Sequence, residues 1–332
     1  MGFMKRYFRR ALSLALGVMV LAVPFAGLAE EAEQELSKEE LLELWAETIP
    51  EGQDGELSDY LVLPDDFQAP QADTFQLLLI GTDTYSTKSR GRSDTMMLAQ
   101  LDPVNKTVKL VSFLRDMYVK IPGKGSTRLN AAYAYGGPDL LLKTLKTNFG
   151  IEPDAYVSVN FSRMVKLIDA IGGVTVNVSS SEMKQLNSIM KYYNYKMGIG
   201  ENNGLLKKSG TQHLTGKQAM CFARIRKIDS DFQRTDRQRE VIEAAFHKLM
   251  DMSWDKIIDL VTDNIDDVVT NLSLGAAFEL IPTALVAKEA TFETMQIPIK
   301  GGYASKTISG MAVLVPDLTK NVKELNKFLY GD

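Results

Sequence analysis

The sequence is poor in the side chains that carry much of enzyme chemistry. Cys221 is the only cysteine among 332 residues, so an intramolecular disulfide is impossible. Its neighbours Met220 and Phe222 are apolar, and we expect Cys221 to be buried and unreactive. The two histidines, His213 and His247, are far apart and lack partners at the spacing of a metal site or a catalytic triad. Histidine-based acid–base chemistry is therefore not expected.

The chain also lacks an excess of positive charge. Its formal net charge is −4 and its pI is near 5.5, whereas general binders of nucleic acid or anionic membranes spread positive charge over a whole face. The glycine spacing of a P-loop or dinucleotide fingerprint is absent, and there is no internal repeat. With 45% hydrophobic and 24% charged residues, the composition is that of a globular protein with one large domain or two small ones.

The first 29 residues have the pattern of an export signal. A positively charged start is followed by the uncharged run 11–29 and then by acidic residues. Gly27 and Ala29 suit a signal peptidase, but the uncharged run is also about long enough to span a bilayer, so a cleaved signal and a retained signal anchor both stay open. Either form predicts that the chain is exported. Residues 30–72 are acidic, contain turn-forming residues and are predicted to be a linker before a domain at 73–332.

Strand and helix patterns alternate along this domain, which indicates a layered α/β fold. The nearly continuous apolar run 75–80 is typical of a strand buried on both faces. The segment 181–213 has no clear period and is expected to be an irregular excursion. The other predicted strands are 95–101, 107–113, 155–159, 174–178 and 294–299. The predicted helices are 138–148, 162–170, 215–222, 232–252, 254–288 and 317–329.

The most distinctive feature is an arginine cluster between residues 224 and 239. If 223–227 is extended, Arg224 and Arg226 point to one side of the strand and Ile225 points into the core. Arginine presents a planar, charged fork that matches phosphate oxygens. The pattern thus predicts a phosphate site, although two surface arginines in salt bridges would look the same.

The helix after this cluster carries polar residues on its inward face. Its apolar stripe, Val241 to Leu249, continues backwards at helical spacing onto Gln238 and Arg234. A charged residue on a buried stripe needs a partner, and a bound phosphate is one candidate. Asp231 has two compatible interpretations: a helix N-cap, or a carboxylate that orients an arginine or accepts a proton.

Two further clusters contain candidate ligands. Asp83 follows the first strand and Asp94 opens the next, and two carboxylates near phosphate would suit Mg²⁺ or Mn²⁺. Turn-capping aspartates would give the same pattern. Arg115 ends another apolar strand, at the kind of position where α/β folds place ligands, and Arg128 precedes a glycine pair.

Taken in order, these motifs resemble the LytR-CpsA-Psr family of bacterial cell-envelope phosphotransferases. The motifs are Gly-Thr-Asp (81–83), Gly-Arg-Ser-Asp-Thr-Met-Met (91–97), Ser-Phe-Leu-Arg-Asp (112–116), Arg-Leu-Asn-Ala-Ala-Tyr-Ala-Tyr-Gly-Gly (128–137), Arg-Ile-Arg (224–226) and Asp-Phe-Gln-Arg-Thr-Asp-Arg-Gln (231–238). The chain departs from the family pattern at Leu114, Arg128 and Gln233, where Pro, Lys and Gly are usual.

The resemblance implies a layered α-β-α sandwich with a central mixed sheet that encloses a tunnel for a polyprenyl chain. It also implies transfer of a glycopolymer phosphosugar from undecaprenyl pyrophosphate to a hydroxyl of peptidoglycan, at a membrane surface and with no nucleic acid partner. Asp83 and Asp94 would be associated with Mg²⁺ or Mn²⁺, and Asp231 would be the acid beside the last arginine of the set. The residues implied at the pyrophosphate are Arg92, Arg115, Arg128, Arg224, Arg226, Arg234 and Gln238, and those implied in catalysis are Asp231, Arg115, Arg224 and Arg226.

Two alternatives to this transfer reaction stay open at the level of sequence. With water as the acceptor, the same site would be a lipid-pyrophosphate hydrolase. A non-catalytic, regulatory envelope protein that binds polyprenyl phosphate is the other alternative.

Overall fold

The computed structural model describes residues 74–84, 90–102, 104–253, 256–257, 259–260, 263, 268–272 and 290–331. The predicted export signal, the linker and most of the predicted helix 254–288 lie outside these residues. Within the described ranges, no helix combines the length and the apolar character needed to cross a membrane.

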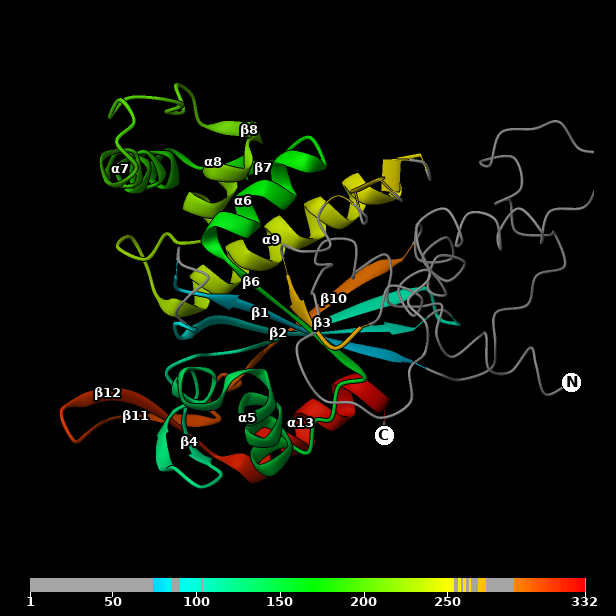
Figure 1. Cartoon of the computed structure of the whole chain (residues 1–332). Coiled ribbons are helices and arrows are strands. Elements are labelled where there is room, and N and C mark those ends of the chain that lie inside the picture. The colour runs from blue at the N-terminus through cyan, green and yellow to red at the C-terminus, as the bar shows by residue number, and fades with distance from the viewer. Residues whose placement is uncertain are drawn as a thin grey trace, which may run out of the picture.

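A six-stranded mixed sheet forms the centre of the structure (Figure 1). Its spatial order is β10-β3-β2-β1-β6-β9. The pairs β1–β2, β2–β3 and β6–β9 are antiparallel, whereas β1–β6 and β3–β10 are parallel. The strands are β1 (Phe75–Thr82), β2 (Ser93–Asp102), β3 (Thr107–Phe113), β6 (Ala155–Asn160), β9 (Val269–Thr270) and β10 (Thr291–Ile297).

Alternating side chains of β1 explain why the sheet is covered on both faces. Leu77 and Leu79 belong to one hydrophobic cluster, and Leu78 and Ile80 belong to a second. All four are buried. Because successive side chains of a strand point to opposite faces, a continuous apolar run must be buried between two layers.

Helices and hairpins supply these two layers (Figure 1). One face packs against α6 (Phe161–Ala170), α7 (Ser180–Lys196), α8 (Gly216–Phe222), α9 (Asp231–Met250) and the hairpin of β7 (Val174–Val178) and β8 (Gly210–Leu214). The opposite layer contains α5 (Ala131–Phe149), α13 (Leu318–Tyr330), the hairpin of β4 (Tyr118–Ile121) and β5 (Gly125–Arg128), and that of β11 (Tyr303–Ile308) and β12 (Met311–Pro316). The predicted α-β-α sandwich with a central mixed sheet is confirmed.

A close approach of α6 and α8 depends on Gly216. A Cβ atom at this position would lie 2.0 Å from the carbonyl oxygen of Val165. The Gly216 amide also donates a hydrogen bond to the Asp169 carboxylate at 2.6 Å. Only glycine lets the two helices pack this closely, and both helices form part of the cavity described below.

Several predicted elements differ from the structure. Residues 223–227 are a turn and irregular chain rather than a strand. The segment 181–213, expected to be irregular, contains most of α7, whose start is stabilised by a Ser179–Glu182 capping box. The predicted strand 294–299 is β10, which spans 291–297. Helix α5 starts seven residues before the predicted Pro138, because a kink at Gly137 joins an extra N-terminal stretch to the predicted helix.

Candidate active site

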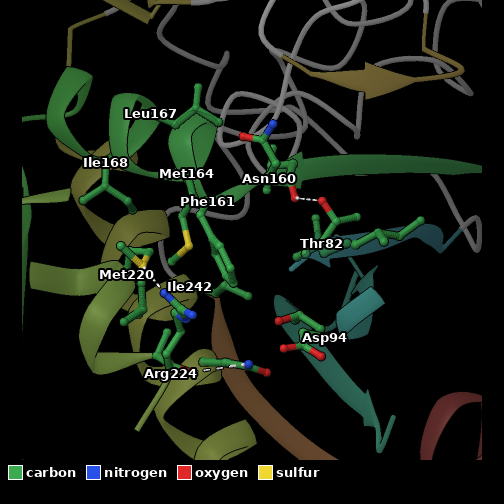
Figure 2. A pocket seen from close by; sticks show the side chains of 18 of the residues that line it. Thr82, Asp94, Asn160, Phe161, Met164, Leu167, Ile168, Met220, Arg224 and Ile242 are labelled. Carbon is green, nitrogen blue, oxygen red and sulfur yellow. Dashed lines mark hydrogen bonds between the residues drawn. The ribbon is translucent and has the colours of Figure 1, made fainter. Parts of the chain in front are cut away.

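A cavity of about 240 Å³ lies between the sheet and the layer of α6, α8 and α9. Strands β1 and β6 form its floor, and most of its wall is apolar. Figure 2 shows the α6 side chains Met164, Leu167 and Ile168 on one side of the cavity and Asp94 across from them. The apolar lining also includes Leu79, Val157, Met220, Val241 and Ala245. Such a wall suits a hydrocarbon chain.

Charged side chains gather at one part of this apolar lining. Five of the predicted site residues line the cavity: Asp94, Arg224, Arg226, Arg234 and Gln238. They come from the start of β2, from the turn after α8 and from the first turns of α9. Residues distant in sequence therefore meet in one place.

The turn that carries Arg224 and Arg226 produces the predicted arrangement without the predicted strand. Ile225 is fully buried, whereas the arginines on either side are partly exposed. The guanidinium carbon of Arg224 lies 4.1 Å from the centroid of the Phe161 ring, within the range of a cation–π interaction. Figure 2 shows this ring beside Arg224 at the edge of the cavity. The prediction that both arginines converge on one volume is confirmed.

Arg234 is almost completely buried, with 2% of its side chain exposed. Its Nη2 donates hydrogen bonds to the Asp231 carboxylate at 2.9 Å and to the Asp94 carbonyl at 3.1 Å. Burial lowers the pKa of Arg234 to about 10, and the attraction of Asp231 offsets only part of this effect. Gln238, one turn further along α9, is also buried. The inward polar stripe predicted for α9 is thus confirmed.

Two carboxylates hold the arginines together. Arg115 Nη1 donates a hydrogen bond to Asp94 at 2.5 Å, and its Nε lies 3.7 Å from Asp231. Arg226 lies 3.8 Å from Asp94 and 3.7 Å from Asp231. Asp231 therefore contacts three guanidinium groups, those of Arg115, Arg226 and Arg234.

The carboxylates of this cluster do not fully compensate its guanidinium groups. Burial lowers the pKa of Arg115, but the attraction of Asp94 and Asp231 has the larger combined effect, so the pKa is raised overall. Burial and the nearby Arg115 lower the pKa of Arg226, even though the same two carboxylates oppose this effect. Three buried guanidinium nitrogens, Arg115 Nε, Arg226 Nη2 and Arg234 Nε, have no hydrogen-bond partner among the described residues. Unsatisfied buried donors are costly, and an anion would satisfy them.

Asp231 is not the N-cap of α9. Ser230 occupies that position, its hydroxyl accepts a hydrogen bond from the Phe232 amide, and Gln233 completes a capping box. Asp231 is the first helical residue, and its side chain faces the arginines instead. The interpretation of Asp231 as a cap is wrong, and its role in orienting arginines is supported. Gln233, which departs from the family pattern, thus has a local structural role.

The two predicted metal ligands lie at the same end of the β1–β2 pair. Asp83 is exposed, is absent from the cavity lining and accepts a hydrogen bond from the Arg92 amide at 2.7 Å. Asp94 lines the cavity and pairs with Arg115. The described part of the chain contains no group of three or more His, Cys, Asp or Glu side chains that could hold a metal. A metal at this position would need oxygen ligands from a bound molecule, as Mg²⁺ commonly does with phosphate.

Arg92 and Arg128 lie outside the central cluster. Arg92 is exposed beside Asp83. Arg128 Nε lies 3.3 Å from Asp116, and its guanidinium donates hydrogen bonds to the Ala312 carbonyl. Asp116 in turn lies 3.7 Å from Arg115. Among the residues that the structure describes, Asp116 is the link between Arg128 and the cluster.

Two contributions to the site were not predicted. Phe161 supports Arg224 through its ring contact. The one signal for Phe161 in the sequence was its position at the junction of β6 and α6. Arg237, which is 6% exposed, binds Glu182 of α7 at 2.7 Å, the Ile225 carbonyl at 3.2 Å and the Asp229 carboxylate. Because Ile225 lies between the two cavity arginines, Arg237 holds their turn in place. The sequence offered one signal: Arg237 is the second of three arginines in the first half of α9.

The geometry combines an apolar cavity with a cluster of cations that have unused donors. It can bind an amphipathic molecule with a hydrocarbon part and an anionic end. Fixed guanidinium groups can also stabilise charge that develops on a phosphoryl group during transfer.

Comparisons with known proteins point to one family. The model of the LytR_cpsA_psr family matches residues 51–327. The polyisoprenyl-teichoic acid–peptidoglycan teichoic acid transferase TagV of Bacillus subtilis is 34% identical over 185 residues, which cover 54% of this chain and 44% of TagV. The match thus spans less than half the length of this relative.

Solved structures resemble the chain over a larger share of its length. A structure of TagT bound to LIIa-WTA has 30% identity and a TM-score of 0.62, and the match covers 77% of this chain and 91% of that one. A structure of YwtF (TagT) with bound octaprenyl pyrophosphate lipid has 28% identity and a TM-score of 0.57, with coverages of 77% and 90%.

Proposed function

Because this chain belongs to the LytR_cpsA_psr family, we propose that it transfers a glycopolymer phosphosugar from a polyprenyl pyrophosphate to a hydroxyl of peptidoglycan. One observation carries the proposal: an apolar cavity ends in buried guanidinium N–H groups that lack partners. A prenyl chain fits the apolar wall, and a pyrophosphate fits the unused donors. The names of the similar proteins, a teichoic acid transferase and a structure with octaprenyl pyrophosphate, support the same substrate class.

In the proposed reaction, the acceptor oxygen attacks the phosphorus atom next to the sugar. The bond from that phosphorus to the bridging oxygen breaks, the prenyl monophosphate leaves, and the acceptor proton is released to a base. Arg224, Arg226 and Arg234 hold the phosphate oxygens and stabilise the negative charge on them. Asp231 contacts three of the arginines and acts as a positioning residue for them.

We assign a divalent metal, Mg²⁺ or Mn²⁺, to the side of the site that carries Asp94 and Asp83. Their hard oxygen donors suit these ions when the substrate phosphates supply further ligands. When bound, the metal would neutralise phosphate charge. Calorimetry with inorganic pyrophosphate tests this assignment. The protein should bind Mg²⁺ tightly only when pyrophosphate is present, and Asp94→Asn should lower the Mg²⁺ affinity measured with pyrophosphate. Equal Mg²⁺ binding by Asp94→Asn would argue against a role for Asp94.

The proposed reaction places the chain outside the cytoplasm, where peptidoglycan is available. This location agrees with the predicted export signal. It also leaves the choice between cleavage and anchoring of that signal to experiment.

A transfer assay tests the function directly. The chain is incubated with a polyprenyl-pyrophosphate-linked glycopolymer, peptidoglycan and Mg²⁺, and both attached and released polymer are measured. Attachment should fall by at least about 100-fold in Arg224→Gln and Arg226→Gln, which each remove charge-assisted contacts to phosphate. Lys306→Gln, on the exposed strand β11, is the matched control and should keep wild-type activity.

The outcome of this assay separates the three possible functions. Attachment to peptidoglycan identifies a transferase, and release of free polymer without attachment identifies a hydrolase. Lipid binding without turnover would indicate a regulatory binding protein. Wild-type attachment by both arginine variants would refute the proposed site.

A further inference from the structure

The segment that contains α7 has a local excess of positive charge. Between residues 183 and 208 there are five lysines and one acid, Glu201, in a chain with a formal net charge of −4. The only acid in α7 itself is Glu182, which faces inward to Arg237. The outer side of α7 therefore carries positive charge without compensating carboxylates of its own.

Large apolar and aromatic side chains are exposed in the same segment. Tyr192 and Tyr195 are 62% and 75% exposed, and Met197 and Ile199 are 41% and 40% exposed. Other large hydrophobic residues on the described surface, such as Val104 and Leu318, are far apart in the sequence. A group of four within eight residues is thus a local patch and not ordinary surface scatter.

Helical spacing places these side chains together. Lys184, Lys191 and Tyr195 are exposed at intervals of seven and four residues, whereas Leu186 and Met190 face the core. The ammonium group of Lys196 lies 5.6 Å from the centroid of the Tyr192 ring. We call this surface the α7 face. Its members are Lys191, Tyr192, Tyr195 and Lys196 of α7, together with Met197 and Ile199 of the turn that directly follows the helix.

The α7 face is held firmly on the domain. The capping box at Ser179 stabilises the start of the helix, and Glu182 ties it to Arg237 of α9. Leu186 and Met190 are fully buried in the same hydrophobic cluster as the cavity residue Met220. Figure 1 shows α7 at the outer edge of the layer that covers the cavity. The exposed patch is therefore presented by an ordered element on the cavity side of the sheet.

We infer that the α7 face docks on an anionic lipid bilayer. Tyrosine rings favour the membrane–water interface, and lysines extend their charged ends to anionic headgroups while their stems stay in the apolar zone. The aliphatic side chains Met197 and Ile199 decide between a bilayer and a sugar polymer. Sugars can stack on tyrosine, but they offer no apolar phase for a methionine or an isoleucine.

This docking mode agrees with the overall acidity of the chain. A general membrane binder would spread basic residues over a whole face, whereas the α7 face needs only the lysines of one helix and the apolar side chains beside them. Docking on this side would bring the cavity layer close to membrane lipids. The inference concerns where the chain contacts the bilayer and does not depend on the transfer reaction.

The test uses the full chain and a fluorescent probe that reports the environment of a single position. Binding of the predicted export signal, residues 1–29, to vesicles would therefore not be mistaken for contact by the α7 face. Cys221 is buried, and a single new cysteine can therefore be labelled selectively with an environment-sensitive dye. The variant Tyr195→Cys places the dye on the α7 face. The variant Leu318→Cys is the matched control, because it is exposed on the opposite layer of the sandwich.

Vesicles that contain phosphatidylglycerol should shift the emission of the dye at position 195 to shorter wavelength and leave position 318 unchanged. Adding K191E/K196E to the labelled Tyr195→Cys chain should weaken binding of the α7 face by at least about 30-fold, since each lysine near an anionic surface contributes about fivefold. Thermal unfolding and pyrophosphate binding should stay unchanged in this variant, which separates loss of docking from loss of the active site.

Three outcomes would overturn the inference. The first is an equal response at positions 195 and 318, and the second is an equal response to neutral and anionic vesicles. The third is a response at position 195 to a soluble anionic glycopolymer but not to vesicles, which would assign the α7 face to the polymer.

Discussion

Two buried arginines on α9 should respond in opposite ways to the same substitution. Arg234 and Arg237 are 2% and 6% exposed. Arg237 has a carboxylate partner on two sides, Glu182 and Asp229. Arg234 shares its single carboxylate, Asp231, with two other arginines and has an Nε without a partner. Methionine has a similar length and no charge, so it isolates the electrostatic contribution of each arginine.

The variant Arg234→Met should be more stable than the wild type when no ligand is bound. Replacing a complete buried ion pair by apolar side chains is neutral or stabilising by about 1–4 kcal/mol, and removing Arg234 alone has the same direction when its carboxylate keeps other cations. Asp231 would keep Arg115 and Arg226, each 3.7 Å away. At about 2–4 °C per kcal/mol for a domain of this size, a gain of about 1–2 kcal/mol raises the Tm by roughly 2–8 °C.

The variant Arg237→Met should be clearly less stable, because it leaves two carboxylates without their cation. Breaking a buried ion pair costs about 3–5 kcal/mol. Glu182 and Asp229 keep 18% and 20% exposure, so the lower end of that range applies. A loss of about 3 kcal/mol lowers the Tm by roughly 6–12 °C.

Binding of inorganic pyrophosphate gives the second measurement. Arg234→Met should weaken it by roughly 10- to 100-fold, which corresponds to about 1.5–3 kcal/mol for a hydrogen bond to a charged group. Differential scanning calorimetry and isothermal titration on the same samples measure both quantities. A fall in Tm in Arg234→Met as large as that in Arg237→Met would refute the reasoning, as would unchanged pyrophosphate affinity in Arg234→Met.

Three other predictions test the packing around the site. Burial raises the pKa of the Cys221 thiol to about 12, so iodoacetamide at pH 8 should label the unfolded chain and leave the native chain unlabelled; rapid native labelling would contradict this. Gly216→Ala should lower the free energy of unfolding by about 1–3 kcal/mol through a clash with the backbone of α6, which is measured as a lower urea midpoint. Gly200→Ala, where a Cβ meets open space, is its control. Equal midpoints for the two variants would argue against the close approach. Phe161→Leu should weaken pyrophosphate binding by roughly 2- to 30-fold, since a cation–π contact to Arg224 contributes about 0.5–2 kcal/mol; a titration with unchanged affinity would show that the ring does not orient Arg224.

Local sequence pattern determined much of the fold. The apolar run of β1 required burial on both faces, and the 3.6-residue period of α9 placed Arg234 and Gln238 on the inward side. The alternation around Ile225 predicted the directions of Arg224 and Arg226, even though the segment is a turn. These features were readable because each depends on residues close together in the chain.

The same local reasoning failed where tertiary contacts decide. Helix α7 has a weak apolar period, and its stability comes from a capping box and from packing against the core, so the segment looked irregular. Asp231 seemed equally suited to cap a helix or to bind arginines, and the choice depends on Ser230 and on the distant Arg115.

The sequence by itself determined the class of fold, the arginine cluster and a set of acidic and basic residues suited to phosphate. Only the tertiary structure decided which of them share a cavity. Asp94, Arg226 and Arg234 meet there, whereas Arg92 and Arg128 lie outside its lining. Only the tertiary structure also showed that Phe161 supports Arg224 and that α7 exposes its tyrosines. The physical reason is that ion pairs, ring contacts and burial depend on distances between remote segments, which periodicity along one chain does not encode.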